Sequence, residues 1–473
     1  MATSLFRLKP IADATGHSEL RRSMGRGALL FFAIGSIIGS GIFVILGVAI
    51  PKAGPAVLLS FVLAAVAALF SALSYAEFAS AIPASGSSYT YAYVTLGEIV
   101  AWVVGWMLML EYGVSVAAVA VGWGEYLNDF LGTFGIVIPE QFANPPGDGG
   151  VFNVPALLVV VMCTLLLIRG ASESAKLNMV MVLLKIGILV FFCVVAFTAF
   201  DPNNLTPFLP LGLLGVTAAA GQVFFSYIGF DAASTAGEEA KNPRRDLPFA
   251  IIGSLVVVTI LYLLVALAAL GAQPWQDDEG KGSEALLTTI ADRATGATWP
   301  GALIALGAIV SIFSVVLVTL YGQTRILFAM GRDGLLPKVF TRVSPRTQTP
   351  IANTIIVAAV IAIPASFVSL GQLAEATSIG THGAFAVGNI GVIVLRRRQP
   401  DLPRGFTTPL FPLMPILGLV LIVVIVAGLD WVTWVAFAAW MAIGLVIYFT
   451  YSRRHSLLNA PGPAGATSRS AGG

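Results

Sequence analysis

The sequence predicts an all-α integral membrane protein with twelve transmembrane helices. Apolar residues make up 57% of the 473 residues and charged residues only 11%, whereas ordinary soluble domains carry about 25% charged residues. Twelve apolar segments have a length suited to crossing a bilayer as helices. Lysine and arginine residues are also distributed very unequally between the two sides of these segments, as in multi-pass membrane proteins.

The twelve segments follow one another through polar connections, and no stretch suggests a separate soluble domain. The segments are 28–50, 54–82, 96–123, 154–169, 176–200, 212–236, 248–272, 299–328, 351–370, 371–395, 411–429 and 431–451. The segment at 154–169 is short for the hydrocarbon core, so we expect it to cross steeply. Almost no loop separates 351–370 from 371–395, so we expect these two to form a tight hairpin.

The basic residues predict the orientation of the chain. Of the 26 Lys and Arg residues, 22 fall on the side that holds both ends of the chain. Lys52, Lys281 and Arg293 fall on the other side, and Lys185 lies inside a span. Because basic loops stay in the cytoplasm, we expect a multi-pass protein of the cell membrane with both termini cytoplasmic.

The chain divides into three expected parts. Residues 1–27 form a cytoplasmic N-terminal segment without the apolar core and cleavage site of a secretory signal peptide. Residues 28–452 form the twelve-helix domain. Residues 453–473 form a cytoplasmic tail whose small and polar composition predicts disorder.

Three ionisable residues lie inside predicted spans: Glu111 in the third, Lys185 in the fifth and Asp231 in the sixth. An ionisable group at the bilayer centre costs about 2.5–3.5 kcal/mol on insertion scales, so each is a candidate functional residue. One alternative is a structural ion pair, for which Glu111 and Lys185 are suited. The other is a side chain that extends to the membrane surface. For Asp231 a functional role is the favoured interpretation.

Other residues in the spans have simpler interpretations. His382 in the tenth span is either a packed, hydrogen-bonded side chain, which we favour, or a proton relay. Glu77 and Arg325 lie near cytoplasmic helix ends, where we expect interfacial roles. Cys163 and Cys193 lie in apolar runs and are interpreted as small hydrophobic residues.

Two predicted spans contain glycines that weaken a helix. The first contains AIGSIIGSGIF at 33–43, where the Gly-Ser-Gly at 39–41 suggests an unwound turn. Close helix packing through small residues is the alternative. The sixth contains FFSYIGFD at 224–231, with Gly229 at an equivalent depth. Gly-interrupted spans in corresponding positions of two halves indicate a transporter's binding site.

An unwound segment inside a membrane helix has chemical consequences. It leaves backbone N–H groups without partners on one side of the break and carbonyl groups on the other. The N–H end of a helix attracts an anion such as a carboxylate, whereas carbonyl oxygens accept hydrogen bonds from an ammonium group. A site with both therefore fits the α-carboxylate and α-amino groups of an amino acid. Irregular backbone at this depth also indicates a cavity.

Four stretches of the chain resemble the amino acid–polyamine–organocation superfamily. They are GSIIGSGIFV in the first span, WMLMLEYGVSVAAVAVGW in the third, FFSYIGFDAASTAGEEAKNPRRDLP in the sixth and YGQTRILFAMGRDGLLPKVF after the eighth. The last three resemble its cationic amino acid transporter group. The resemblance covers roughly residues 20–455. It implies a LeuT-type 5+5 inverted repeat with broken helices 1 and 6, the repeats at 28–200 and 212–395, and two extra helices at 411–451.

The resemblance also implies site residues. Substrate recognition falls on Ile38, Gly39, Ser40 and Gly41 in the first helix and on the carbonyls around Phe225, Ser226 and Ile228 in the sixth. Phe225 matches an aromatic residue that closes over substrate, and Asp231 matches an acidic residue that faces a cationic side chain. Thr319 lies where the side-chain size of the substrate is tuned. Lys185 matches a lysine that replaces a sodium ion in proton-coupled members, and Glu111 matches an acidic position that we group with proton coupling.

These features favour a secondary active transporter that imports amino acids by alternating access. The favoured substrates are arginine, lysine or ornithine, with protons as the coupling ion, because a lysine that titrates can replace sodium. A broad carrier of small neutral amino acids, an exchanger and an amino acid sensor that does not transport remain alternatives.

The sequence also predicts which partners to expect. It contains no nucleotide-binding loop, hydrolase nucleophile motif or metal-ligand cluster, so we expect no enzyme activity, cofactor or metal. The expected partners are the amino acid, protons and the lipid bilayer, with a small single-span protein or a bound lipid as a further candidate. We expect no nucleic acid partner and a functional monomer.

Overall fold

The structure of the chain, a computed structural model, describes residues 5–11, 24–39, 41–83, 87–170, 175–278, 285–344, 347 and 349–459. Within these ranges the chain is helical and contains no strand. A single isolated β-bridge joins Met24 to Ala240. The predicted site residue Ser40 and the C-terminal tail from residue 460 onward lie outside the described residues.

Helices occur in every range that the sequence singles out, which confirms the all-α class. Their bounds are α2 Arg26–Ile37, α3 Gly41–Ala53, α4 Val57–Ala81, α5 Ser87–Thr95, α6 Glu98–Gly132, α7 Glu140–Ala143, α8 Val154–Ile168, α9 Ala175–Phe197, α10 Gly212–Val223, α11 Ala232–Thr235, α12 Pro243–Ala272, α13 Leu286–Thr295, α14 Trp299–Arg332, α15 Ile351–Phe367, α16 Leu370–Arg398, α17 Leu413–Ala427, α18 Trp431–Ile447 and α19 Arg453–His455. Among the described residues, 8 helical stretches are long and apolar enough to cross a membrane, and α8, α15 and α17 are shorter apolar helices.

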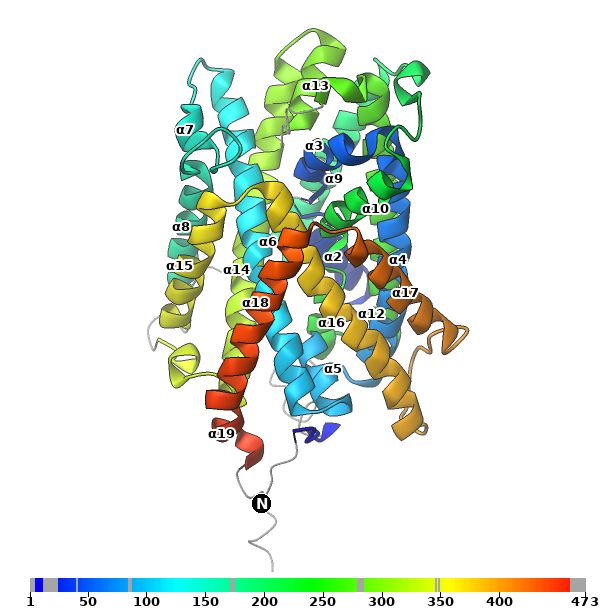
Figure 1. Cartoon of the computed structure of the whole chain (residues 1–473), viewed down its shortest axis with the longest axis vertical. Helices are drawn as coiled ribbons and strands as arrows, with labels where there is room; N and C mark the ends of the chain where they lie inside the picture. Colours follow the sequence, from blue (N-terminus) through cyan, green and yellow to red (C-terminus); the bar gives the residue numbers. More distant parts are fainter. Residues whose placement is uncertain are drawn as a thin grey trace, which may run out of the picture.

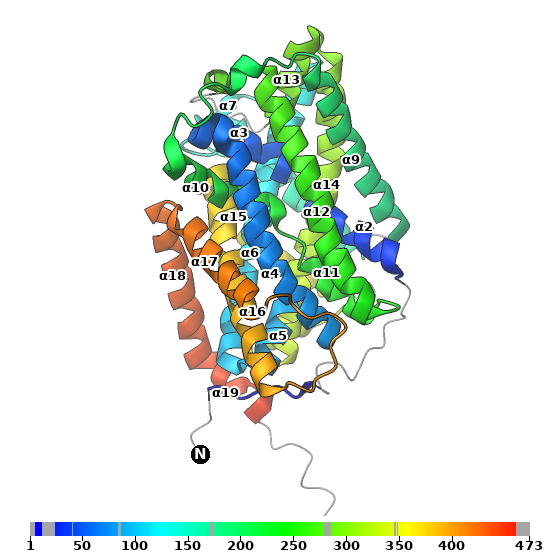
Figure 2. The ribbon, with the colours of Figure 1, turned by 90° about the vertical axis from the view of Figure 1, so that its right-hand side faces the viewer.

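The long helices run roughly along the long axis of the molecule (Figures 1 and 2). Helices α7 and α13 lie at one end, and α5 and α19 lie at the opposite end. Helix α6 occupies a central position, since α14 and α16 both pack against it. Helix α12 packs against both α2 and α4. This arrangement surrounds the broken helices with continuous ones.

Small residues allow the closest contacts between these helices. A Cβ atom at Gly122 of α6 would overlap the side chain of Val44 on α3. A Cβ atom at Gly383 of α16 would lie 2.7 Å from Sδ of Met107 on α6. Because lipid tails are as apolar as the helices, close packing rather than water exclusion holds membrane helices together. A side chain at Gly122 would therefore push α6 and α3 apart, whereas one at Gly383 would displace the flexible end of Met107.

Two helical stretches are interrupted where the sequence contains its glycine-rich segments. Helix α2 ends at Ile37, and α3 begins at Gly41. Helix α10 ends at Val223 and is followed by a 3-10 turn at Phe224–Tyr227. Residues 228–231 are not helical, and α11 begins directly after them. We refer to the interruption between Ile37 and Gly41 as the first break and to the interruption between Val223 and Ala232 as the second break.

The described parts of the two termini meet at the end of the molecule that holds α5 and α19. Glu98, buried at the start of α6, forms an ion pair with Arg7, with Oε2 and Nη2 3.0 Å apart. The same carboxylate accepts hydrogen bonds from the hydroxyls of Tyr448 at 3.1 Å and Ser456 at 2.6 Å. The two termini therefore lie on the same side of the helical body, as the sequence predicts.

Candidate functional site

A cavity of about 840 Å³ borders the two breaks. Its lining comes from the broken helices and from α5, α6, α9 and α14. Away from the breaks it is lined by Glu239 and by Arg332 at the end of α14. The next residue, Asp333, forms an ion pair with Lys9 at 3.2 Å. The cavity therefore extends from the breaks toward the end of the molecule where the termini meet.

A polar cluster lies on the opposite side of the breaks, and we call it the outer cluster. Nζ of Lys52, at the end of α3, lies 2.7 Å from Oε1 of Glu375 on α16. Glu375 is only 3% exposed. Its Oε2 accepts hydrogen bonds from Thr433 Oγ1 at 3.0 Å and from the Asp430 N–H at 3.2 Å. The outer cluster therefore joins the first broken helix to α16 and to the start of α18.

Most of the predicted site residues line the cavity. They are Gly39, Gly41, Glu111, Lys185, Phe225, Ile228, Asp231 and Thr319. Ile38 and Ser226 are fully buried and are not among the lining residues. Their backbone groups remain candidates for recognition, as the resemblance implies, but their side chains do not reach the cavity.

The backbones of the two breaks contact each other through glycines. A Cβ atom at Gly41 would lie 2.6 Å from Cα of Ser226 in the second break. A Cβ atom at Gly229 would overlap the carbonyl oxygen of Ser36 in α2. Gly229 also has a φ of 115°, a conformation that favours glycine. Unwinding and close packing, which the sequence left as alternatives, thus occur together at this crossing.

The breaks place polar backbone groups at the edge of the cavity. Helix α3 begins at Gly41, which lines the cavity, so the N–H groups of its first turn have no partners within the helix. On the second break, Phe225 and Ile228 line the same cavity on either side of the end of the 3-10 turn. Residues of both breaks therefore border one space.

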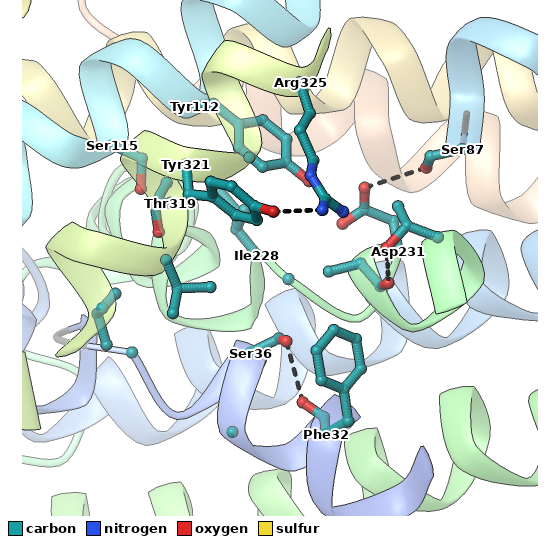
Figure 3. A pocket seen from close by; sticks show the side chains of 18 of the residues that line it. Phe32, Ser36, Ser87, Tyr112, Ser115, Ile228, Asp231, Thr319, Tyr321 and Arg325 are labelled. Atoms are coloured by element: carbon teal, nitrogen blue, oxygen red, sulfur yellow. Dashed lines mark hydrogen bonds between the residues drawn. The ribbon is translucent and has the colours of Figure 1, made fainter. Parts of the chain in front are cut away.

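Two carboxyl groups line the cavity with few partners. Asp231 is 1% exposed, and Ser87 Oγ donates to its Oδ2 at 3.5 Å (Figure 3). Its Oδ1 has no hydrogen-bond partner among the described residues. Glu111 on α6 is also 1% exposed, and neither of its oxygens has a hydrogen-bond partner within the described chain. Burial of a carboxylate without partners is costly, so these two residues are the strongest functional candidates in the cavity.

Lys185 lies on α9 and lines the same cavity while only 2% exposed. Helix α9 packs against both α2 and α14. The lysine is therefore positioned between the first broken helix and α14, where the resemblance implies an ammonium group in place of a sodium ion. Its coupling role stays a prediction.

Arg325 is exposed and lies seven residues before the end of α14, and its expected interfacial role stays a prediction. It lines the cavity from α14, and its guanidinium lies over the ring of Tyr321, 4.3 Å from the centroid, and donates to the Tyr321 hydroxyl (Figure 3). Helical periodicity could have indicated that Arg325 faces the cavity. Val318, Gly322, Arg325 and Ala329 follow one another at intervals of four, three and four residues, and all of them line the cavity.

His382 lies buried outside the cavity lining. Its Nδ1 is 2.7 Å from the carbonyl oxygen of Ser378, one helical turn earlier on α16. Its ring packs on Phe224, with centroids 3.9 Å apart. Nε2 has no hydrogen-bond partner among the residues that the structure describes. This geometry supports the interpretation of His382 as a packed, hydrogen-bonded side chain.

Comparison with known proteins gives the family. The sequence profile of the amino acid permease family matches residues 25–455. The branched-chain amino acid permease of Bacillus subtilis (strain 168) is 45% identical, over 97% of this chain and 100% of its own length. The methylthioribose transporter of the same organism is 43% identical, over 97% and 100%. The vacuolar cationic amino acid transporter 4 of Arabidopsis thaliana is 37% identical, over 82% of this chain and 65% of its own length. The chain is therefore a multi-pass membrane protein of the amino acid permease family, within the amino acid–polyamine–organocation superfamily.

Proposed function

We propose that this protein is a secondary active transporter that carries uncharged amino acids across the cell membrane by alternating access. The observation that carries the proposal is the cavity at the crossing of the two breaks. In this proposal the chain crosses the membrane twelve times, with both termini cytoplasmic. The fold is a LeuT-type 5+5 inverted repeat at 28–200 and 212–395, followed by two helices at 411–451.

The two breaks supply recognition of a zwitterion. The N–H groups at the start of α3 are suited to the substrate carboxylate, because a helix N-terminus carries partial positive charge. The carbonyl groups of the second break are suited to the ammonium group. Phe225 borders the same space, where its ring can close over the bound substrate. Transporters with discontinuous helices bind substrates in this manner.

The charged residues of the cavity favour a substrate without net charge. They are Glu111, Asp231, Glu239, Lys185, Arg325 and Arg332, so acids and bases are equal in number. When all six groups are ionised, a cationic side chain would add an unbalanced charge beside the buried Lys185, which the low polarity of that part of the cavity penalises. The two relatives that match this chain over nearly its whole length are named for branched-chain amino acids and for methylthioribose. Neither name denotes a cation.

A specific observation favours a second candidate, the import of arginine, lysine or ornithine. Asp231 lines the cavity with one carboxyl oxygen that has no partner among the described residues. An ionised carboxylate there would form a charge-assisted hydrogen bond with a cationic side chain. Relatives named as cationic amino acid transporters match a smaller share of the chain.

We further propose that protons drive transport. Buried carboxyl groups with few hydrogen-bond partners, such as Glu111 and Asp231, are stable at this depth when they bind a proton. Lys185 lines the same cavity and supplies a cation for the state in which a carboxyl group is ionised. The proposed functional unit is the monomer in the bilayer. A small single-span protein or a bound lipid is proposed as a further partner of this monomer.

Equilibrium binding to the purified protein tests the substrate class. Labelled L-leucine is displaced by unlabelled L-valine, L-alanine, L-arginine, L-lysine or methylthioribose. We expect the neutral amino acids to compete and arginine and lysine to compete at least about tenfold more weakly, which corresponds to about 1.4 kcal/mol. Strong binding of arginine that is lost in Asp231→Asn would contradict the neutral class and establish the second candidate.

A further inference from the structure

One side chain connects the two breaks without entering the cavity. The hydroxyl of Tyr262 on α12 lies 3.0 Å from the carbonyl oxygen of Ile37 and 3.0 Å from that of Ser226. The first carbonyl belongs to the last residue of α2, and the second belongs to the 3-10 turn of the second break. Tyr262 is fully buried and is not among the cavity-lining residues.

Because its hydroxyl bonds to both breaks, Tyr262 connects them, and we call a hydrogen-bonded connection between these two segments a tie. A phenol has one hydrogen, so at any moment it donates fully to one carbonyl or is shared between the two. Leaving a buried carbonyl without its donor costs roughly 1–3 kcal/mol. The ring is held in place by edge contacts with Tyr227 at 5.4 Å and with Phe61 at 6.2 Å between centroids. The hydroxyl therefore holds one carbonyl group from each broken helix at hydrogen-bonding distance from the same oxygen atom.

A second tie joins the same two segments nearer the termini. The Met24 N–H donates to the Glu239 carbonyl at 3.0 Å, and the Lys241 N–H donates to the Met24 carbonyl at 2.9 Å. Between the two ties, Gly229 lies against the Ser36 carbonyl. The region of α2 is thus connected to residues 226–241 just before its start, through Met24, and at its end, through Ser36 and Ile37.

On the basis of the proposed transport function, we propose that Tyr262 is a positioning residue that makes α2 and residues 226–241 move as one unit. When the cavity opens or closes, these segments shift together relative to α6 and α14, which line its other side. Loss of the hydroxyl weakens the connection between the breaks and replaces no side chain of the cavity lining. The rate of the conformational step should therefore fall more than substrate affinity does.

Tyr262→Phe keeps the ring and removes only the tie. In proteoliposomes we expect the Vmax of L-leucine uptake to fall about tenfold or more while KM changes less than about threefold, as for a residue that acts on a conformational step. L-arginine replaces leucine as the probe if the binding panel establishes cationic substrates. Unchanged Vmax, or a change confined to KM, would overturn the proposal.

Tyr126→Phe is the matched control. Its buried hydroxyl donates to the Phe43 carbonyl at 2.6 Å, inside the continuous part of α3. The control loses one tyrosine hydroxyl and one hydrogen bond but no connection between the breaks, so we expect Vmax within about twofold of wild type. A loss equal to that of Tyr262→Phe would mean that any buried hydroxyl has this effect, and the proposal would be overturned.

A cross-link tests the joint movement without relying on Tyr262→Phe. Met24→Cys and Ala240→Cys are combined in a chain in which Cys163 and Cys193 are replaced by alanine. The β-bridge brings positions 24 and 240 together. If the segments move as one unit, oxidation of the pair leaves the uptake rate equal to that of the reduced protein. If oxidation stops uptake, the segments must separate during transport. Absence of uptake by the wild type would instead refute the proposed function.

Discussion

At the scale of single residues, Glu111 and Asp231 are the same chemical group in different surroundings. Asp231 receives a hydrogen bond from Ser87 and lies two residues after Gly229, whose φ is 115°. Glu111 projects from a continuous helix and has no hydrogen-bond partner among the described residues. The charge of Glu111 is therefore the less compensated of the two, so it is the group whose protonation should respond most to the state of the cavity.

Glu111→Gln removes the titratable proton while keeping the size of the side chain. We expect the variant to exchange internal for external leucine within about twofold of the wild-type rate, because binding and movement do not require the charge. We expect it to lose accumulation driven by a pH gradient. Glu140→Gln, in an exposed turn of α7, is the control. Gradient-driven accumulation that survives in Glu111→Gln would remove Glu111 from the coupling mechanism.

Arg325→Gln removes one of the positive charges that balance the carboxyl groups of the cavity. We expect arginine and lysine to compete for the leucine site about tenfold better in this variant, since the lining becomes net negative. Competition binding measures the change. Arg397→Gln, which removes an exposed charge at the end of α16, should leave the competition unchanged. The charge-balance argument is wrong if the two variants behave alike.

The sequence located the carboxyl groups and Lys185 because a charge inside an apolar span is conspicuous against its neighbours. Arg325 was missed because a basic residue near a helix end has an ordinary explanation at the membrane surface. Tyr262 was missed for a different reason. A tyrosine in an apolar span looks like a core residue, and the carbonyl oxygens that it bonds belong to other helices. Only the folded chain brings those partners together.

At the scale of elements, the crossing of the two breaks organises the site. Glycines weaken helices wherever they occur, so the positions of the breaks could be predicted from the Gly-Ser-Gly at 39–41 and from Gly229. The reciprocal contacts, Gly41 against Ser226 and Gly229 against Ser36, could not be predicted. They join segments far apart in the chain, and no local pattern encodes which backbone approaches which.

Gly229→Ala tests the crossing. Alanine would strain a backbone with a φ of 115° and would overlap the Ser36 carbonyl. We expect a cost on the order of 2 kcal/mol or more, measured as a lower unfolding temperature in detergent together with loss of leucine binding. Gly187→Ala on α9 is the control, because a Cβ atom there meets nothing within 4 Å. Wild-type stability and binding in Gly229→Ala would show that the two backbones are not pressed together.

At the scale of the whole molecule, the cavity and the outer cluster lie on opposite sides of the breaks. The cavity extends toward the termini, and Lys52 and Glu375 join helices on the other side. Alternating access requires the outer cluster to separate when the site opens the other way. Loss of the buried Glu375 charge removes the 2.7 Å contact and leaves the partly exposed Lys52 with the exposed Asp430 carboxylate, 3.7 Å away, as its ion-pair partner, so the outer cluster is weakened.

Glu375→Gln should therefore favour opening on the side of the outer cluster. A cysteine at Val318, which lines the cavity, reports this opening through its reaction with a membrane-impermeant thiol reagent added outside. We expect the reaction to be about tenfold faster in Glu375→Gln, as for a shift of about 1.4 kcal/mol between two states. Asp277→Asn breaks the exposed pair with Arg293 and should have little effect. Equal rates in both variants would mean that the outer cluster does not control access.

Net accumulation is the decisive measurement of whether the cavity at the breaks carries amino acids across the membrane. Purified wild-type protein is reconstituted into liposomes without sodium, and uptake of labelled L-leucine and L-arginine is measured with and without an inward proton gradient. We expect leucine to accumulate above its external concentration under the gradient, and a proton carrier to abolish this accumulation. Uptake of both amino acids that never exceeds that of protein-free liposomes would show that the protein does not transport them.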